Sequence, residues 1–265
     1  MNRKPYPTDL SDEQWKLLET MLPPPEQFGR KPSVHLREIF NALLSVLRTG
    51  CAWRYMPDEF PNWTTVYYYF QKWRNAEWFA TLNERLRRQL RKQHGRDENA
   101  SAAIIDSQSV KTMEEGFNER GFDVGKKING RKRDILVDTL GLLLAVKVHG
   151  RQPMSRTVMA QNFFSRRAAE RFPRLFLIWA DGGYRGKLIK WVALNCLWLL
   201  EIVKRCDELV GFQVLARGSV VERTFAWLNK ERRLSKDYER ECQTSEAWIY
   251  LAMVSLMLKR VKLQN

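Results

Sequence analysis

The sequence predicts an α/β protein in which a mixed sheet with flanking helices follows a small all-α region. Residues 1–97 space their apolar side chains with helical periodicity, whereas residues 98–265 mix short β-branched runs with helical segments. Two of the short runs end directly on an aspartate, at Asp106 and at Asp181. We therefore expect a helical domain over residues 1–97 and a sheet-containing domain over residues 98–265.

The charge of the chain indicates its partner. With 265 residues and a formal net charge of +15, the chain is suited to a polyanion. Nucleic acid is the usual polyanion, and an acidic membrane surface is the main alternative. The longest apolar stretch, residues 247–258, is shorter than the roughly 18 residues of a membrane span and predicts a buried helix. The first residues lack an apolar signal core, so we expect a cytoplasmic protein and not a secreted one. With nucleic acid as the favoured partner, we expect it to be nucleoid-associated and to make no membrane contact.

Cysteine and histidine are sparse and show no metal-ligand spacing. No CxxC pair occurs, so we expect free, reduced thiols, as in a cytosolic protein. The histidines are too few for a histidine-based metal site or triad, and we expect structural or solvated roles for them. The residues concerned are Cys51, Cys196, Cys206, Cys242, His35, His94 and His149.

The first 97 residues predict several helices. Ser11 and Gln14 form a capping-box pattern at the start of one helix, and Gly50 follows another that begins near residue 36. Further helices are expected over residues 64–74 and 78–93. The arrangement is similar to a helix-turn-helix DNA reader, with Gln71, Lys72 and Arg74 as candidate DNA contacts. The alternative is a plain helical bundle whose aromatic side chains are all core.

The later residues predict alternating strands and helices. A hairpin turns at Gly141, and the last helix is expected to be amphipathic. The expected ranges are strands at 132–138, 142–148 and 198–203, and helices at 154–171, 187–195 and 244–262, with one further helix around Glu222. This order resembles the ribonuclease-H-like fold.

Three acids predict metal chemistry. Asp106 and Asp181 end strands, and Glu222 lies on a helix, so strand-end carboxylates converge on one edge of the sheet. Hard oxygen ligands with open positions suit Mg²⁺, which completes its shell with water and phosphate. The alternative is that these acids are ordinary capping or salt-bridged groups. Basic side chains that could grip the DNA backbone beside such a site, or form a solvated loop instead, are Lys126, Lys127, Arg131, Lys132 and Arg133.

Five stretches together resemble transposases of the IS5 group within the IS4-like DDE class. They are residues 47–57, 105–112, 130–133, 180–186 and 221–228. The resemblance implies that Asp106, Asp181 and Glu222 form a metal-binding DDE triad with two Mg²⁺ ions, for which Mn²⁺ can substitute. It implies a homodimer that binds terminal inverted repeats of double-stranded DNA, cuts there and joins the 3′-hydroxyls to target DNA. Arg223 and Lys230 are additional candidate DNA contacts.

Four positions depart from the pattern of that group. Relatives usually carry His at the position of Asp134, Arg and often Trp at Gly218 and Ser219, and Lys at Asn229. The metal ligands are intact, but charged side chains around them are missing. A catalytically inactive DNA-binding relative is therefore an alternative, and a nuclease without strand transfer is another. Metal-dependent nicking of DNA that carries the repeats distinguishes these hypotheses.

Overall fold

The computed structural model describes residues 3–24, 34–113, 121–123, 127–150, 166–203 and 218–262. Lys126, Cys206 and most of the helix expected from residue 154 lie outside the described residues. None of the helices in the described ranges is long and apolar enough to cross a membrane.

The helices before the sheet follow the predicted boundaries closely. The capping box of Ser11 and Gln14 is present, and Gly50 ends its helix with a left-handed φ of 71°. The elements are α1 (Asp12–Glu19), α2 (Leu36–Thr49), the 3₁₀ turn η1 (Trp53–Tyr55), α3 (Trp63–Asn75) and α4 (Trp78–Gln93). The helical prediction for this region is confirmed.

The sheet is mixed, as expected. Its order is β2-β3-β1-β5-β6, with β4 also paired to β3. Strand β1 runs antiparallel to β3 and parallel to β5, and β6 continues the parallel part. The predicted hairpin is confirmed as β3 and β4. The strands are β1 (Ala102–Lys111), β2 (Gly121–Asp123), β3 (Ile128–Asp138), β4 (Leu143–Gly150), β5 (Leu177–Ala180) and β6 (Leu199–Ile202).

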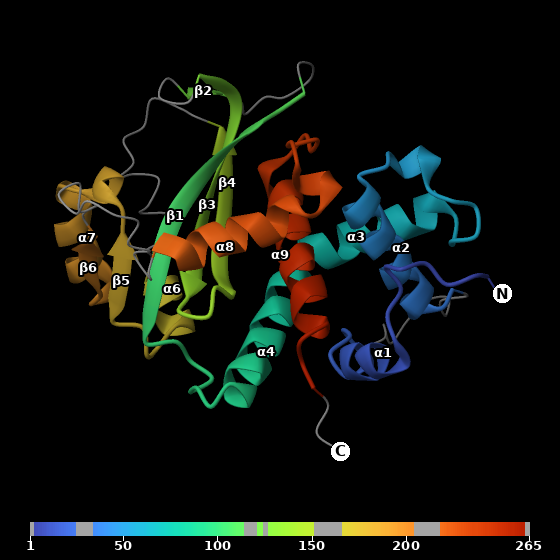
Figure 1. Cartoon of the computed structure of the whole chain (residues 1–265), viewed down its shortest axis with the longest axis horizontal. Coiled ribbons are helices and arrows are strands. Elements are labelled where there is room, and N and C mark those ends of the chain that lie inside the picture. Colours follow the sequence, from blue (N-terminus) through green and yellow to red (C-terminus); the bar gives the residue numbers. More distant parts are fainter. Residues whose placement is uncertain are drawn as a thin grey trace, which may run out of the picture.

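Helices cover both faces of the sheet. Because side chains alternate along a strand, Ile104 and Ile135 point into the larger core beneath α8 and α9, whereas Ile105 and Leu136 join a smaller core under α7. Figure 1 shows α8 crossing the sheet at β1, with α7 beside β5 and β6. The remaining elements are α6 (Arg166–Arg171), η2 (Gly182–Tyr184), α7 (Lys187–Cys196), α8 (Gly218–Asn229), η3 (Arg232–Leu234) and α9 (Cys242–Leu258).

Helix α9 is the centre of the larger core. It packs against α2, α3, α4, α8 and β4 and is buried on nearly every side, which makes the expected one-sided amphipathic helix wrong. The buried-helix interpretation of residues 247–258 is confirmed. One hydrophobic core contains side chains from Leu10 to Leu90 together with those of α9 and the sheet. The expected boundary at residue 97 falls between α4 and β1, but the hydrophobic core continues across it.

Candidate active site

Two predicted acids are neighbours on adjacent parallel strands. The last residue pair between β1 and β5 joins Ile105 to Ala180, and the next residues are Asp106 and Asp181. Asp181 directly follows the end of β5, but β1 continues to Lys111, so the expectation that a strand ends at Asp106 is wrong. Parallel strands lie about 4.8 Å apart, so both carboxylates leave the sheet at one level. Asp106 Oδ1 accepts from the amide of Ser107 at 2.6 Å, and Asp181 Oδ1 accepts from the amide of Gly183 at 2.8 Å. These local bonds orient each carboxylate by its own backbone.

A buried tyrosine feels the negative charges of these two acids and of a third, Asp134. Tyr184 in η2 is 6% exposed. Burial raises the pKa of Tyr184 well above its usual value, and the negative charges of Asp134, Asp106 and Asp181 raise it further, while a hydrogen bond with Ser107 lowers it. The phenol is therefore held in its neutral form amid three carboxylates. It can donate one hydrogen bond there, but it cannot neutralise their charge.

Asp134 is an acid near this site that sequence reasoning did not place there. It lies on β3 directly opposite Ser107 of β1, and its Oδ2 is 2.7 Å from Nε2 of His149. Both side chains are largely buried, so His149 has a structural partner and is not a solvated histidine. The signal that places Asp134 is the register between β1 and β3, two strands that are well separated in the sequence.

Helix α8 carries the third predicted acid. Val221, Phe225 and Leu228 pack into the larger core, whereas Glu222 is exposed. Within the described residues, no group of three or more His, Cys, Asp or Glu side chains is placed so that it could hold a metal ion. The structure thus brings Asp106 and Asp181 together and leaves Glu222 outside a common metal-binding group.

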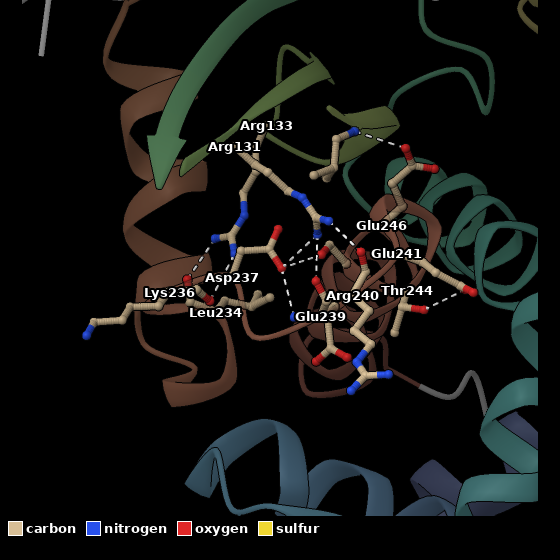
Figure 2. A network of polar contacts seen from close by, with 12 residues as sticks. Arg131, Arg133, Leu234, Lys236, Asp237, Glu239, Arg240, Glu241, Thr244 and Glu246 are labelled. Carbon is tan, nitrogen blue, oxygen red and sulfur yellow. Dashed lines mark hydrogen bonds and ion pairs between the residues drawn. The ribbon is translucent and has the colours of Figure 1, made fainter. Parts of the chain in front are cut away.

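Two predicted DNA contacts are instead interior links. Arg131 donates to the carbonyls of Glu239 and Arg240 at 2.7 and 2.6 Å, and Arg133 donates to the carbonyl of Leu234 at 2.7 Å. Both arginines are 1% exposed. Figure 2 shows both side chains reaching from β3 to the segment between η3 and α9. Both guanidinium groups donate to backbone carbonyls in the interior, so the expectation that they bind DNA phosphates is wrong.

The same segment is also fastened to β1. The amide of Asp237 donates to the carbonyl of Lys111 at 2.8 Å, and Asp237 Oδ1 accepts from the hydroxyl of Ser245 at 2.6 Å. Arg131 lies 3.4 Å from the same carboxylate, and both side chains are fully buried. The chain between α8 and α9 is thereby fixed to two central strands, which also fixes where α8 ends.

The other predicted DNA contacts lie in separate places. On α3, Arg74 pairs with Glu241 at 2.6 Å, Gln71 donates to the hydroxyl of Tyr67, and Lys72 is half-buried. Helix α9 lies between α3 and the sheet (Figure 1), so the α3 residues do not join the acids. Four further predicted DNA contacts have side chains that are exposed or half-buried, namely Lys127, Lys132, Arg223 and Lys230.

A mixed α/β sheet with acids at neighbouring positions of two adjacent parallel strands is the arrangement of ribonuclease-H-like proteins. A family model described as "Transposase DDE domain" matches residues 97–257, and one described as "Putative transposase of IS4/5 family" matches residues 10–83. The chain belongs to the DDE-domain transposases of insertion sequences. It is also 33% identical over 114 residues to the "Insertion element IS402 uncharacterized 16.2 kDa protein" of Burkholderia cepacia, a match that covers 40% of this chain and 76% of that protein.

Proposed function

We propose that this chain binds the terminal inverted repeats of an insertion sequence, cuts DNA there and joins the freed 3′-hydroxyls to target DNA. The observation that carries the proposal is the position of Asp106 and Asp181, each directly after the paired residues Ile105 and Ala180. Two carboxylates at one level of adjacent strands repel each other unless a cation lies between them. Membership of the DDE transposases supports a DNA phosphodiester as the substrate.

Asp106, Asp181 and Glu222 are the proposed metal ligands. Carboxylate oxygens fit Mg²⁺, with Mn²⁺ as a substitute, and a pair of such ions when bound would activate the attacking oxygen and stabilise the leaving one. The amides of Ser107 and Gly183 each donate to one oxygen of an aspartate and so orient the two carboxylates.

The placement of Glu222 is supported by its position on α8. Glu222 and Asn229 are seven residues apart and so share one stripe of the helix. The side chain of Asn229 accepts from Gln108 of β1 at 3.4 Å, and Gln108 points to the same face of the sheet as Asp106. That stripe of α8 is therefore turned toward the strand that carries Asp106.

The proposed DNA contacts are Lys127, Lys132, Arg223 and Lys230, which are exposed or half-buried, together with Lys126, which lies outside the described residues. Arg131 and Arg133 are not among them because both are buried. Two transposon ends must be held together, so a homodimer on DNA in the cytoplasm is part of the proposal.

The test is cleavage of a labelled duplex that carries the terminal repeat of the element, with Mg²⁺ or Mn²⁺. Wild-type protein is compared with Asp181→Asn, which keeps the shape of the side chain, and with Asp58→Asn, an exposed aspartate outside the site. We expect nicking by the wild type and by Asp58→Asn only when metal is present, and binding without nicking by Asp181→Asn.

Three outcomes overturn parts of the proposal. Equal nicking by Asp181→Asn removes this residue from the metal ligands. Binding of the repeat without nicking by the wild type makes the chain a DNA-binding relative that has lost catalysis. Equal cutting of duplexes with and without the repeat makes it a nuclease without end recognition.

A further inference from the structure

Two arginines that are far apart in the sequence both lie against the ring of one tryptophan. The guanidinium carbon of Arg223 on α8 lies 5.2 Å from the ring centroid of Trp227, and that of Arg260, just after α9, lies 4.2 Å from it. Both arginines are exposed, and the tryptophan is half-buried. Guanidinium planes are attracted to an indole ring within about 6 Å, so the ring holds both cations at one place on the surface.

The turn between β3 and β4 contacts both the ring of Trp227 and the side chain of Arg223. A Cβ atom added at Gly141 would lie 3.2 Å from the ring of Trp227, so glycine lets the turn approach the indole closely. Thr224 donates to the carbonyl of Gly141 at 2.8 Å, and Arg223 donates to the carbonyl of Leu140 at 3.2 Å. Before any ligand arrives, these contacts restrict the freedom of the ring and of Arg223.

The charges at this place lack an acidic counterpart. In the described parts of the chain, no carboxylate pairs with Arg223 or Arg260, whereas Arg91, Arg74 and Arg233 all have one. Partial burial and then the neighbouring Arg223 lower the pKa of Arg260. Two positive charges that the fold already holds close together favour the binding of an anion. Their mutual repulsion is overcome during folding and does not weaken the binding step.

We propose that Arg223, Trp227 and Arg260 form a docking site for the phosphate backbone of double-stranded DNA, an inference that rests on the proposed transposase function. Arginine suits this partner because its planar group donates two parallel hydrogen bonds to phosphate oxygens. Since α8 also carries Glu222, a strand bound here passes beside the helix of the third acid. Phosphate contacts position DNA without reading its sequence, so this site acts on any duplex.

The test is DNA affinity of the full chain measured over a range of salt concentrations. Arg260→Ala is compared with Lys190→Ala, which removes an equal charge from the exposed face of α7 at the other side of the sheet. Loss of one phosphate contact reduces the slope of log affinity against log salt by about 0.9 and weakens binding about fivefold near 0.15 M salt. The loss should be equal for a repeat-bearing and a random duplex, and Lys190→Ala should match the wild type.

A second variant tests whether a loss of binding results from misfolding. Arg260→Gln keeps much of the stem that covers the indole ring and removes only the charge, and its thermal unfolding is compared with that of the wild type. If the wild type binds DNA and the affinities of Arg260→Ala and Arg260→Gln equal that of Lys190→Ala, the docking site is overturned. The proposed function is not affected by that result. Failure of the wild type to bind any duplex overturns the proposed function itself.

Discussion

Nη1 of Arg91 lies 2.7 Å from Oδ2 of Asp138, and the two side chains are 6% and 0% exposed. The arginine belongs to the last turn of α4, and the aspartate ends β3. The other oxygen of Asp138 accepts from the amides of Leu140 and Leu142, each at 2.9 Å. One carboxylate thus shapes the β3–β4 turn and joins it to the helical region, so the hairpin and the N-terminal helices are mechanically linked.

Arg91→Ala should strongly destabilise the fold. Removing one member of a buried pair leaves an uncompensated charge and costs about 3–5 kcal/mol. Unfolding by denaturant, followed by circular dichroism, measures the change. The control is Arg88→Ala, whose i,i+4 pair with Glu84 is partly exposed and should change the free energy of unfolding by about 0.5 kcal/mol. Similar losses in both variants would contradict the structural role of the Arg91–Asp138 pair.

Arg131→Gln should lower stability and leave the salt dependence of DNA binding unchanged. The variant loses the bonds to the carbonyls of Glu239 and Arg240, and each buried group left without a partner costs about 1–3 kcal/mol. Lys132→Gln, at the next position but half-buried, should instead reduce the salt slope with little loss of stability. A reduced slope in Arg131→Gln would restore this residue as a DNA contact.

Gly141→Ala should cost more than Gly95→Ala, although both glycines have left-handed backbones. At Gly95, with φ of 65°, an added Cβ meets nothing within 4 Å, so only the backbone penalty of about 1 kcal/mol applies. At Gly141, with φ of 81°, the Cβ would lie 3.0 Å from Oγ1 of Thr224 and 3.2 Å from the ring of Trp227. We expect a loss of at least about 2 kcal/mol in the free energy of unfolding there. Equal losses of unfolding free energy in the two variants would mean that the turn at Gly141 accommodates the added Cβ atom without an energetic penalty.

Glu246→Gln should make stability less dependent on pH. Burial raises the pKa of Glu246 above its usual 4.5, and Lys147 partly opposes this shift. As pH rises from 4.5, the unfolded chain loses this proton before the folded one does, so stability falls until the folded pKa is passed. The variant lacks this titration, and its denaturation midpoint should decline less over that window. Parallel declines in both proteins would contradict the shift.

Local signals predicted the elements well because their causes are local. The capping pair Ser11 and Gln14, the C-terminal Gly50 and the turn at Gly141 each act within a few residues, and all three occur where expected. The strand-end position of Asp181 follows from an apolar run that ends there. The triad roles of Asp106, Asp181 and Glu222 stay predictions.

Long-range packing could not be predicted from the sequence because it depends on contacts between segments that are distant along the chain. From the sequence, Arg131 and Arg133 look like part of a basic surface patch. They are buried because they donate hydrogen bonds to a segment about 100 residues later in the chain. The burial of α9 on all sides similarly depends on four helices and a strand. Asp134 lies opposite Ser107, the residue after Asp106, because of the strand register, which a single sequence does not specify.

The burial of α9 also sets an order of events during synthesis. A chain still on the ribosome can form α2, α4 and β4 once they emerge, but their apolar faces stay uncovered until Cys242–Leu258 follows. Such exposed surface favours aggregation or capture by chaperones. A chain that lacks residues 242–258 should therefore be unable to complete the larger hydrophobic core.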